Sequence, residues 1–299
     1  MSVERVALRQ QRDLGQLVEA AFSLYRENFW RFFSIAAVLI PFAILGGLLA
    51  LEFAPPFDSV LFETPIEDQQ AYDQAVEDAL REGLIFGAVL LPLVLLQLFA
   101  QWLASMAIVA AVAGLDAERE PELSHAMRQR APSFSRAYGV VLTRFWTLVG
   151  AFLRAAIVVL PFLAFFSVSV ASYLGAPALL ALAGLVLIIP MPWAIQRGVR
   201  WLFIHQAVIL DGTSARAALS YSADAVQGRW WRTVGIALIL WIIVQVPASV
   251  IGALVGFAPV LISGTASAVI TAVILPFGVI AMTLLYLDLK ARRETDVPA

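Results

Sequence analysis

Four basic side chains near the middle of the chain have the types and spacing to bind an anion. Arg154 follows Trp146 by eight residues, which places it about 12 Å along an apolar helix. Arg197, Arg200 and His205 lie three to eight residues apart at the end of a later apolar stretch. Together they could form a pocket for an anion or a phosphate-bearing lipid headgroup. The alternative is that Arg154 extends back to the membrane surface, Arg197 and Arg200 anchor a helix end, and His205 has a structural role.

Three amide side chains lie within apolar stretches. Gln97 and Gln101 are four residues apart and therefore share one helix face, and Gln245 lies in a later stretch. An amide in hydrocarbon needs a hydrogen-bonding partner. These glutamines either bond between helices or line a polar cavity, and the pattern leaves both interpretations open.

No pattern in the sequence is typical of a catalytic, cofactor or metal site. The chain has no cysteine, and His125 and His205 belong to no cluster with metal-ligand spacing. The nucleophile elbow, the Walker phosphate loop and the dinucleotide fingerprint are all missing. We therefore expect no enzymatic activity, no cofactor and no bound metal. An enzyme that acts on a lipid headgroup is the third alternative, after a scaffold or accessory subunit and after a transporter or channel.

The elements that position these side chains are membrane-spanning helices. Of the 299 residues, 61% are hydrophobic and only 14% are charged. A water-soluble domain of this length could not bury so much apolar surface. The net charge of −2 gives no reason to expect nucleic acid as a partner. The scarcity of lysine and the abundance of alanine are typical of bacterial coding bias.

Six apolar stretches are long enough to cross about 30 Å of hydrocarbon. We expect an all-α, polytopic integral membrane protein with one six-helix transmembrane domain over residues 1–290. The expected spans are 32–51, 84–113, 147–173, 178–203, 233–257 and 266–287.

The arginines predict the orientation, because cytoplasmic flanks keep positive charge. With the N-terminus inside, 18 of the 20 basic residues fall in cytoplasmic segments. Residues 52–83 hold nine acidic residues against Arg81, a net charge of −8, and form an acidic extracytoplasmic loop. We expect a multi-pass protein of the cytoplasmic (cell) membrane with both termini in the cytoplasm and a cytoplasmic tail over 291–299.

A pattern of aromatic pairs indicates an internal repeat. Each copy has a basic stretch, an aromatic pair, a span with a proline and a return span that ends in Leu-Asp. The pattern predicts three in-out-in hairpins at about 13–116, 117–211 and 212–290, related by an axis along the membrane normal. The alternative is that aromatic residues and arginines simply mark the interface. The pairs are Phe29-Trp30, Phe145-Trp146 and Trp230-Trp231, the prolines are Pro41, Pro161 and Pro247, and the endings are Leu115-Asp116, Leu210-Asp211 and Leu287-Asp288.

Amphipathic helices on the cytoplasmic side are expected before three of the spans. Asp13 and Gln16 have the spacing of a capping box at the start of the first helix. A weaker pattern includes Phe134 and Tyr138, and another covers 214–227. Such helices either pack under the bundle or provide a docking surface for a partner. The apolar face of the first helix would consist of Leu14, Leu17, Val18, Ala21, Phe22, Tyr25 and Phe29.

The chain resembles the membrane domain that is attached to some bacterial glycerophosphoryl diester phosphodiesterases and that also occurs alone. The resemblance covers nearly the whole chain and implies a multipass helical module without the catalytic barrel. It identifies no active-site residue. The segments that carry it are Asp13-Leu-Gly, Leu24-Tyr25-Arg26-Glu-Asn-Phe29, Gln206-Ala-Val-Ile-Leu-Asp211, Ala217-Ala218-Leu-Ser220, Gly228-Arg-Trp-Trp-Arg232 and Leu285-Tyr286-Leu-Asp288-Leu-Lys290-Ala-Arg292-Arg.

The sequence therefore predicts a non-catalytic scaffold or accessory subunit linked to phospholipid or envelope metabolism. The alternative is a transporter or channel for a small or lipid-derived solute. The expected partners are the lipid bilayer, anionic lipid headgroups, and a membrane protein or a second copy of this chain.

Overall fold

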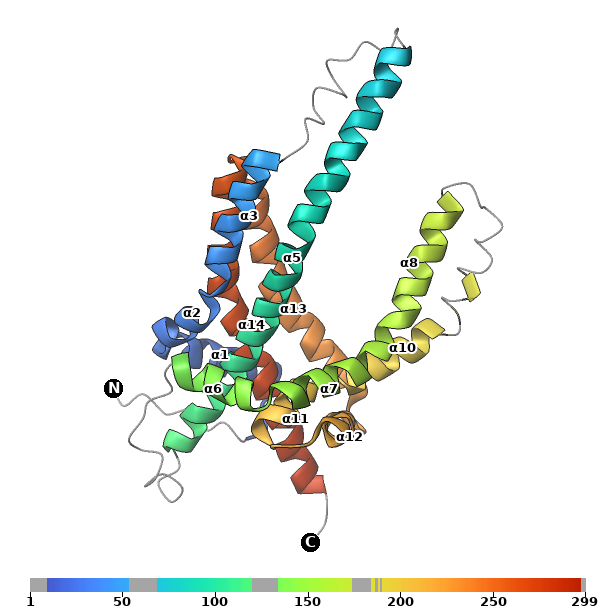
Figure 1. Ribbon diagram of the computed structural model, residues 1–299. Helices are drawn as coiled ribbons and strands as arrows, with labels where there is room; N and C mark the ends of the chain where they lie inside the picture. Colours follow the sequence, from blue (N-terminus) through green and yellow to red (C-terminus); the bar gives the residue numbers. More distant parts are fainter. Residues whose placement is uncertain are drawn as a thin grey trace. The chain divides into compact units, whose positions relative to one another are not determined.

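The computed structural model describes residues 10–53, 69–119, 134–173, 184–185, 188 and 190–296. Within these ranges all regular structure is helical, which confirms the all-α expectation (Figure 1). Four of the described helices are long and apolar enough to cross a membrane, or five if one bent pair forms a single span. The protein is therefore a membrane-embedded, multi-pass helical protein.

The chain divides into two compact units. The first comprises Met1–Arg31, Met106–Ile242 and Phe277–Ala299, and the second comprises Phe32–Ser105 and Ile243–Pro276. Each unit is described by itself below. Most of the polar side chains that carry the argument belong to the first unit.

Three of the expected spans are continuous helices. They are α5 (Gln69–Arg119), α13 (Trp230–Val255) and α14 (Val260–Asp296). Pro92, Pro247 and Pro276 lie inside these helices without ending them. Both α5 and α14 extend well beyond the apolar stretches predicted for them, because their polar ends are also helical.

The first and third expected spans are broken before a proline. The first consists of α2 (Phe29–Ala36) and α3 (Leu39–Phe53), which are bent by 40°, and Pro41 lies in the first turn of α3. The third consists of α7 (Phe145–Ala155), the 3-10 helix η1 (Ala156–Val159) and α8 (Leu160–Tyr173). Pro161 has no amide hydrogen and its ring crowds the carbonyl four residues earlier, in η1, so the regular α-helical ladder cannot continue through this point.

The fourth expected span, 178–203, lies largely outside the described residues. Its last part forms α10 (Pro190–Arg200), and α11 (Ile204–Leu210) follows. Of the acidic loop predicted at 52–83, residues 54–68 lie outside the described ranges, as do His125 and residues 297–299.

Short amphipathic helices precede three membrane helices, as the sequence predicts. They are α1 (Leu14–Glu27), α6 (Phe134–Thr143) and α12 (Ala215–Val226). The capping box of α1 is present: the Gln16 amide donates to Asp13 at 2.8 Å, and the Asp13 amide donates to Gln16 at 3.1 Å. The buried face of α1 is centred on Leu17, Ala20, Ala21 and Leu24, whereas Phe22, which the sequence assigns to the apolar face, is exposed.

The three aromatic pairs have the same local structure. Each pair begins a membrane helix, and its two rings meet edge to face at 4.6 to 5.2 Å between centroids. The second ring of each pair is almost fully exposed: 76% for Trp30, 81% for Trp146 and 80% for Trp231. Such rings suit the membrane–water interface, where tryptophan is enriched.

The first unit has a packed core. Helix α12 contacts α7, α10 and α11, and α10 contacts η1 (Figure 1). The last turns of α14 are buried on all sides at Leu284, Leu285, Tyr286 and Leu289. By contrast, most apolar side chains of α13 and of residues 84–99 of α5 are exposed or partly exposed, as expected for helical segments that face hydrocarbon. The core therefore places two aspartates of the Leu-Asp endings among neighbouring segments.

Candidate functional site

Asp288 is the centre of a buried polar network in the first unit. Its side chain is 0% exposed and lies near the end of α14. An ionised carboxylate without partners would be costly at such a position. The carboxylate must therefore be saturated by the donors that surround it.

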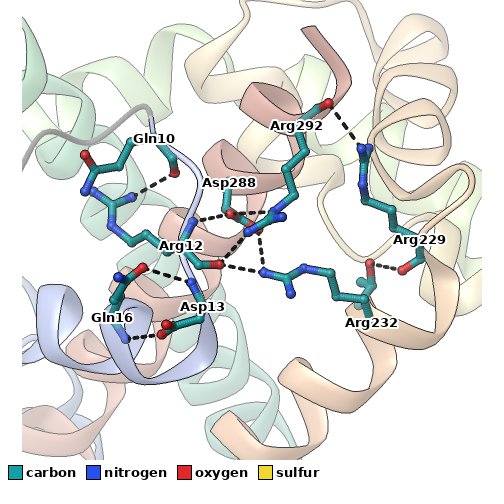
Figure 2. A network of polar contacts seen from close by, with 9 residues as sticks. Gln10, Arg12, Asp13, Gln16, Arg229, Arg232, Asp288 and Arg292 are labelled. Carbon is teal, nitrogen blue, oxygen red and sulfur yellow. Dashed lines mark hydrogen bonds and ion pairs between the residues drawn. The ribbon is translucent and has the colours of Figure 1, made fainter. Parts of the chain in front are cut away.

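Three residues supply those donors, and they come from three parts of the chain. The Arg12 amide donates to Asp288 Oδ1 at 2.7 Å, and Arg292 Nε, one turn along α14, donates to the same oxygen at 2.9 Å. Arg232 Nη2, in the first turn of α13, donates to Oδ2 at 3.2 Å. Figure 2 shows both guanidinium groups pointing toward Asp288.

The same two guanidinium groups also hold the backbone of the N-terminal segment. The Arg12 carbonyl accepts from Arg232 at 2.6 Å and from Arg292 at 2.8 Å (Figure 2). Arg229 donates to the Arg292 carbonyl at 3.1 Å, which extends the network along α14. Burial lowers the pKa of the Arg12 guanidinium, and the Asp288 charge opposes that shift. The arrangement joins the start of α1, the start of α13 and the end of α14.

Asp211 forms a second, similar network after α11. The Tyr286 hydroxyl and Lys290 Nζ, both on α14, donate to its two carboxylate oxygens. The Tyr286 ring is buried against Phe203, with 5.5 Å between ring centroids. Lys290 Nζ also lies 5.7 Å from the centre of the Tyr286 ring. Asp211 thus ties the end of α11 to the end of α14.

Arg144 fixes the turn that follows. Its Nη1 donates to the Val208 carbonyl at 2.7 Å, near the end of α11. Gly212 has φ of +66°, and a Cβ there would lie 3.2 Å from the Arg144 guanidinium nitrogens. Only glycine satisfies both conditions easily.

Arg154 lies on the exposed side of α7. Its Nη1 donates to the Gly150 carbonyl at 2.7 Å, one turn nearer the start of the helix. A Cβ on Gly150 would lie 3.2 Å from Arg154 Nη1 and 3.3 Å from the Ala215 Cβ, so this guanidinium lies where α12 begins. The side chain thus turns back along α7 toward its first turn.

The other three predicted pocket residues lie on the neighbouring helices. Arg197 and Arg200 are in the last turn of α10, and the Arg197 guanidinium lies 5.9 Å from the Trp201 ring centre. The Arg200 carbonyl accepts from the Ser222 hydroxyl of α12 at 2.7 Å. His205, in α11, is different in character: burial lowers its pKa to about 4, so it is neutral near pH 7.

Gln97 lines a hollow in the second unit. The hollow has a volume of about 340 Å³ and is formed by α3, α5 and α14. Ser267 and Thr271 are its other polar lining residues, and the remainder are small or apolar. Gln101 and Gln245 are not part of its lining. Gln245 is exposed on α13.

The structure reveals polar residues that sequence reasoning did not place in a site. In the sequence, Asp211 and Asp288 stand out only as helix ends and as parts of the segments that carry the family resemblance, and Arg232 and Arg292 only as parts of those segments. The recurrence of Leu-Asp at the ends of return spans was the available signal, because an aspartate retained next to apolar residues needs a specific partner. The partners themselves are up to 276 residues away in the chain.

Comparison of the chain with protein-family models, with curated proteins and with solved structures found no match. Within the described ranges, no group of three or more histidine, cysteine, aspartate or glutamate side chains is placed to hold a metal ion.

Proposed function

We propose that the protein is a non-catalytic membrane scaffold or accessory subunit, linked to phospholipid or envelope metabolism. It resides in the cytoplasmic membrane with both termini in the cytoplasm and spans the bilayer six times as three hairpins. Its partners are anionic lipids and another membrane protein or a second copy of the chain.

The saturation of Asp288 and Asp211 carries this proposal. Both oxygens of each carboxylate accept from donors of distant segments, so these acids join parts of the chain. A catalytic acid or base needs at least one site that can reach a substrate. Carboxylates used in this way suit a protein whose function is to hold a fixed shape.

Two further observations support the proposal, one for the membrane arrangement and one for the link to lipid metabolism. The equal local structure of the three aromatic pairs fits three hairpins that enter the bilayer in the same way. The resemblance to the phosphodiesterase membrane domain supports the link to lipid metabolism. That domain is the non-catalytic part of the enzymes to which it is fused.

The test is purification of the full-length chain in native nanodiscs, followed by mass measurement of the assembly. The proposal expects a second subunit, or a second copy, in fixed stoichiometry. It also expects no release of alcohol when the purified protein is incubated with glycerophosphocholine. A monomeric particle, or hydrolysis that follows the protein through purification, would contradict the proposal.

The hollow beside Gln97 favours a second candidate, a transporter for a small or lipid-derived solute. Its volume of about 340 Å³ is at the lower end of small-molecule sites. Proteoliposomes loaded with glycerol 3-phosphate or glycerophosphocholine would separate the two candidates. Transport would require efflux that Gln97→Leu abolishes and that Gln245→Leu, at an exposed position outside the hollow, leaves unchanged. Efflux equal to that of empty vesicles supports the scaffold.

A further inference from the structure

Four arginines lie on the elements that meet at one corner of the first unit, where α12 contacts α7 and α10, and none of them has a carboxylate partner among the described residues. They are defined here as the arginine cluster: Arg154 on α7, Arg197 and Arg200 on α10, and Arg216 on α12. Among the described residues none of the four forms an ion pair. The cluster thus differs from Arg232 and Arg292, whose charges are opposed by Asp288.

Contacts among α7, η1, α10 and α12 place the four arginines on adjoining elements of the first unit. The Arg154 guanidinium and the Ala215 Cβ lie against the same point of Gly150, and Arg216 is the next residue and is exposed. Ser222 is six residues further along α12, about 9 Å. Its hydroxyl holds the Arg200 carbonyl. Gly198 of α10 packs against Val158 of η1, one turn beyond Arg154.

The nearest described acids do not neutralise the cluster. Asp211, three residues before Ser214, is bound by Tyr286 and Lys290. Asp224, on α12, pairs with Arg293 at 3.6 Å. His205 adds no positive charge near pH 7, because burial keeps it neutral. The positive charge of the corner therefore comes from arginine alone.

We infer that the arginine cluster binds the phosphate group of an anionic lipid headgroup, with Arg154 and Arg216 as the central pair. Guanidinium groups bind phosphate through charge-assisted, often bidentate hydrogen bonds. The depth is suitable, since Arg154 reaches back to Gly150, one turn from the interfacial Trp146. This inference replaces His205 in the predicted pocket with Arg216. It rests on the anionic-lipid partner in the proposed function and names the site that binds it, whereas the scaffold role is tested separately by the mass of the assembly.

The test compares lipid retention by the purified full-length protein. Wild type and an Arg154→Gln/Arg216→Gln variant are reconstituted in nanodiscs of phosphatidylcholine with a tenth of phosphatidic acid, and lipids that stay bound are counted by native mass spectrometry. We expect the variant to retain at least about tenfold less phosphatidic acid, because the loss of even one charge-assisted hydrogen bond lowers affinity by about that factor and the variant removes two guanidinium groups. Arg26→Gln, which removes an exposed arginine from α1, is the matched control and retains the wild-type amount.

Two further experiments, a double lysine variant and competition by inorganic phosphate, distinguish the possible ligands and contacts. Arg154→Lys/Arg216→Lys keeps the charge but loses the planar fork, so we expect intermediate retention. Displacement of the lipid by millimolar inorganic phosphate would identify free phosphate as the ligand, whereas no displacement identifies the headgroup. Equal retention of phosphatidic acid by wild type, the double glutamine variant and Arg26→Gln would overturn the inference. Circular dichroism and gel filtration of each variant confirm that it is folded.

Discussion

At the scale of single residues, buried polar groups are the main determinants of this structure. Asp288 is fully buried and depends on Arg232 and Arg292, whose side chains are 31% and 24% exposed. Removing the buried partner of such a network leaves two guanidinium groups without their counter-charge. The energetic consequence is larger than for an ion pair at the surface.

We expect Asp288→Asn to lower the free energy of unfolding by about 3 kcal/mol, because the remaining arginines lose a buried carboxylate. The matched control is Asp224→Asn, whose pairing with Arg293 is 3.6 Å long and 48% exposed on both sides. Its loss should be below about 1 kcal/mol. Denaturant unfolding in detergent micelles measures both. Similar losses for the two variants would mean that the Asp288 network contributes no special stability.

His205 should make stability depend on pH. Its folded-state pKa is lowered from 6.5 to about 4 by burial, so the unfolded chain binds a proton at pH values where the folded chain does not. Stability is therefore complete above pH 6.5 and falls as pH decreases toward 4, by about 1 to 3 kcal/mol. His205→Gln cannot take up this proton. Melting temperatures of both proteins at pH 7.5 and 5 should show the smaller decrease in the variant, and equal decreases would contradict the assignment.

The residue types of the sites were readable from sequence, but their partners were not. The capping box of α1 was predictable because Asp13 and Gln16 are three residues apart and interact locally. The contact of Asp288 with Arg12 joins residues 276 apart and depends on the packing of three helices. Arg154 was identified from its unusual place in an apolar helix, whereas Arg216 looked like an ordinary surface arginine.

At the scale of elements, proline and glycine determine where helices change direction. The sequence showed a proline in every expected span but could not show which would break it. Pro41 and Pro161 follow breaks, while Pro92, Pro247 and Pro276 lie in continuous helices. A helix can absorb the lost hydrogen bond where its neighbours allow it. Whether a proline interrupts its helix therefore depends on packing against neighbouring helices, which cannot be read from the local sequence.

The turns before and after α12 offer a matched pair of glycines. Gly212 and Gly228 have positive φ of 66° and 75°, so alanine strains either position by about 1–2 kcal/mol. Only at Gly212 would the new methyl group also meet the Arg144 guanidinium, which holds the Val208 carbonyl. We expect Gly212→Ala to lose about 1 kcal/mol more than Gly228→Ala in denaturant unfolding. Equal losses would mean that the Arg144 side chain moves aside and keeps its hydrogen bond to the Val208 carbonyl.

At the scale of the whole molecule, the proposed orientation depends on the distribution of charge along the chain. The composition alone was sufficient for the class of protein, since 61% hydrophobic residues require a hydrocarbon environment. The six-span arrangement remains a prediction, because much of the expected fourth span lies outside the described residues. The two compact units were not predictable, as they depend on which long-range contacts form.

The absence of cysteine makes the orientation directly testable. We expect Glu77→Cys, at an exposed position near the start of α5, to react with a membrane-impermeant maleimide on intact cells. Glu294→Cys, exposed at the end of α14, should react only after permeabilisation. The wild-type protein, which has no cysteine, is the unlabelled control. The reverse pattern would place the arginine-rich segments outside the cell.

The bond between Arg12 and Asp288 also has a consequence for how the protein is made. A ribosome at about 5–20 residues per second needs roughly 15 to 55 seconds to pass from one residue to the other. During that interval the N-terminal segment has emerged, but the carboxylate that fastens it has not been synthesised. Chains that stop early, even after most helices are inserted, would keep this segment unfastened. Quality-control proteases could thus distinguish finished from unfinished copies at a single place.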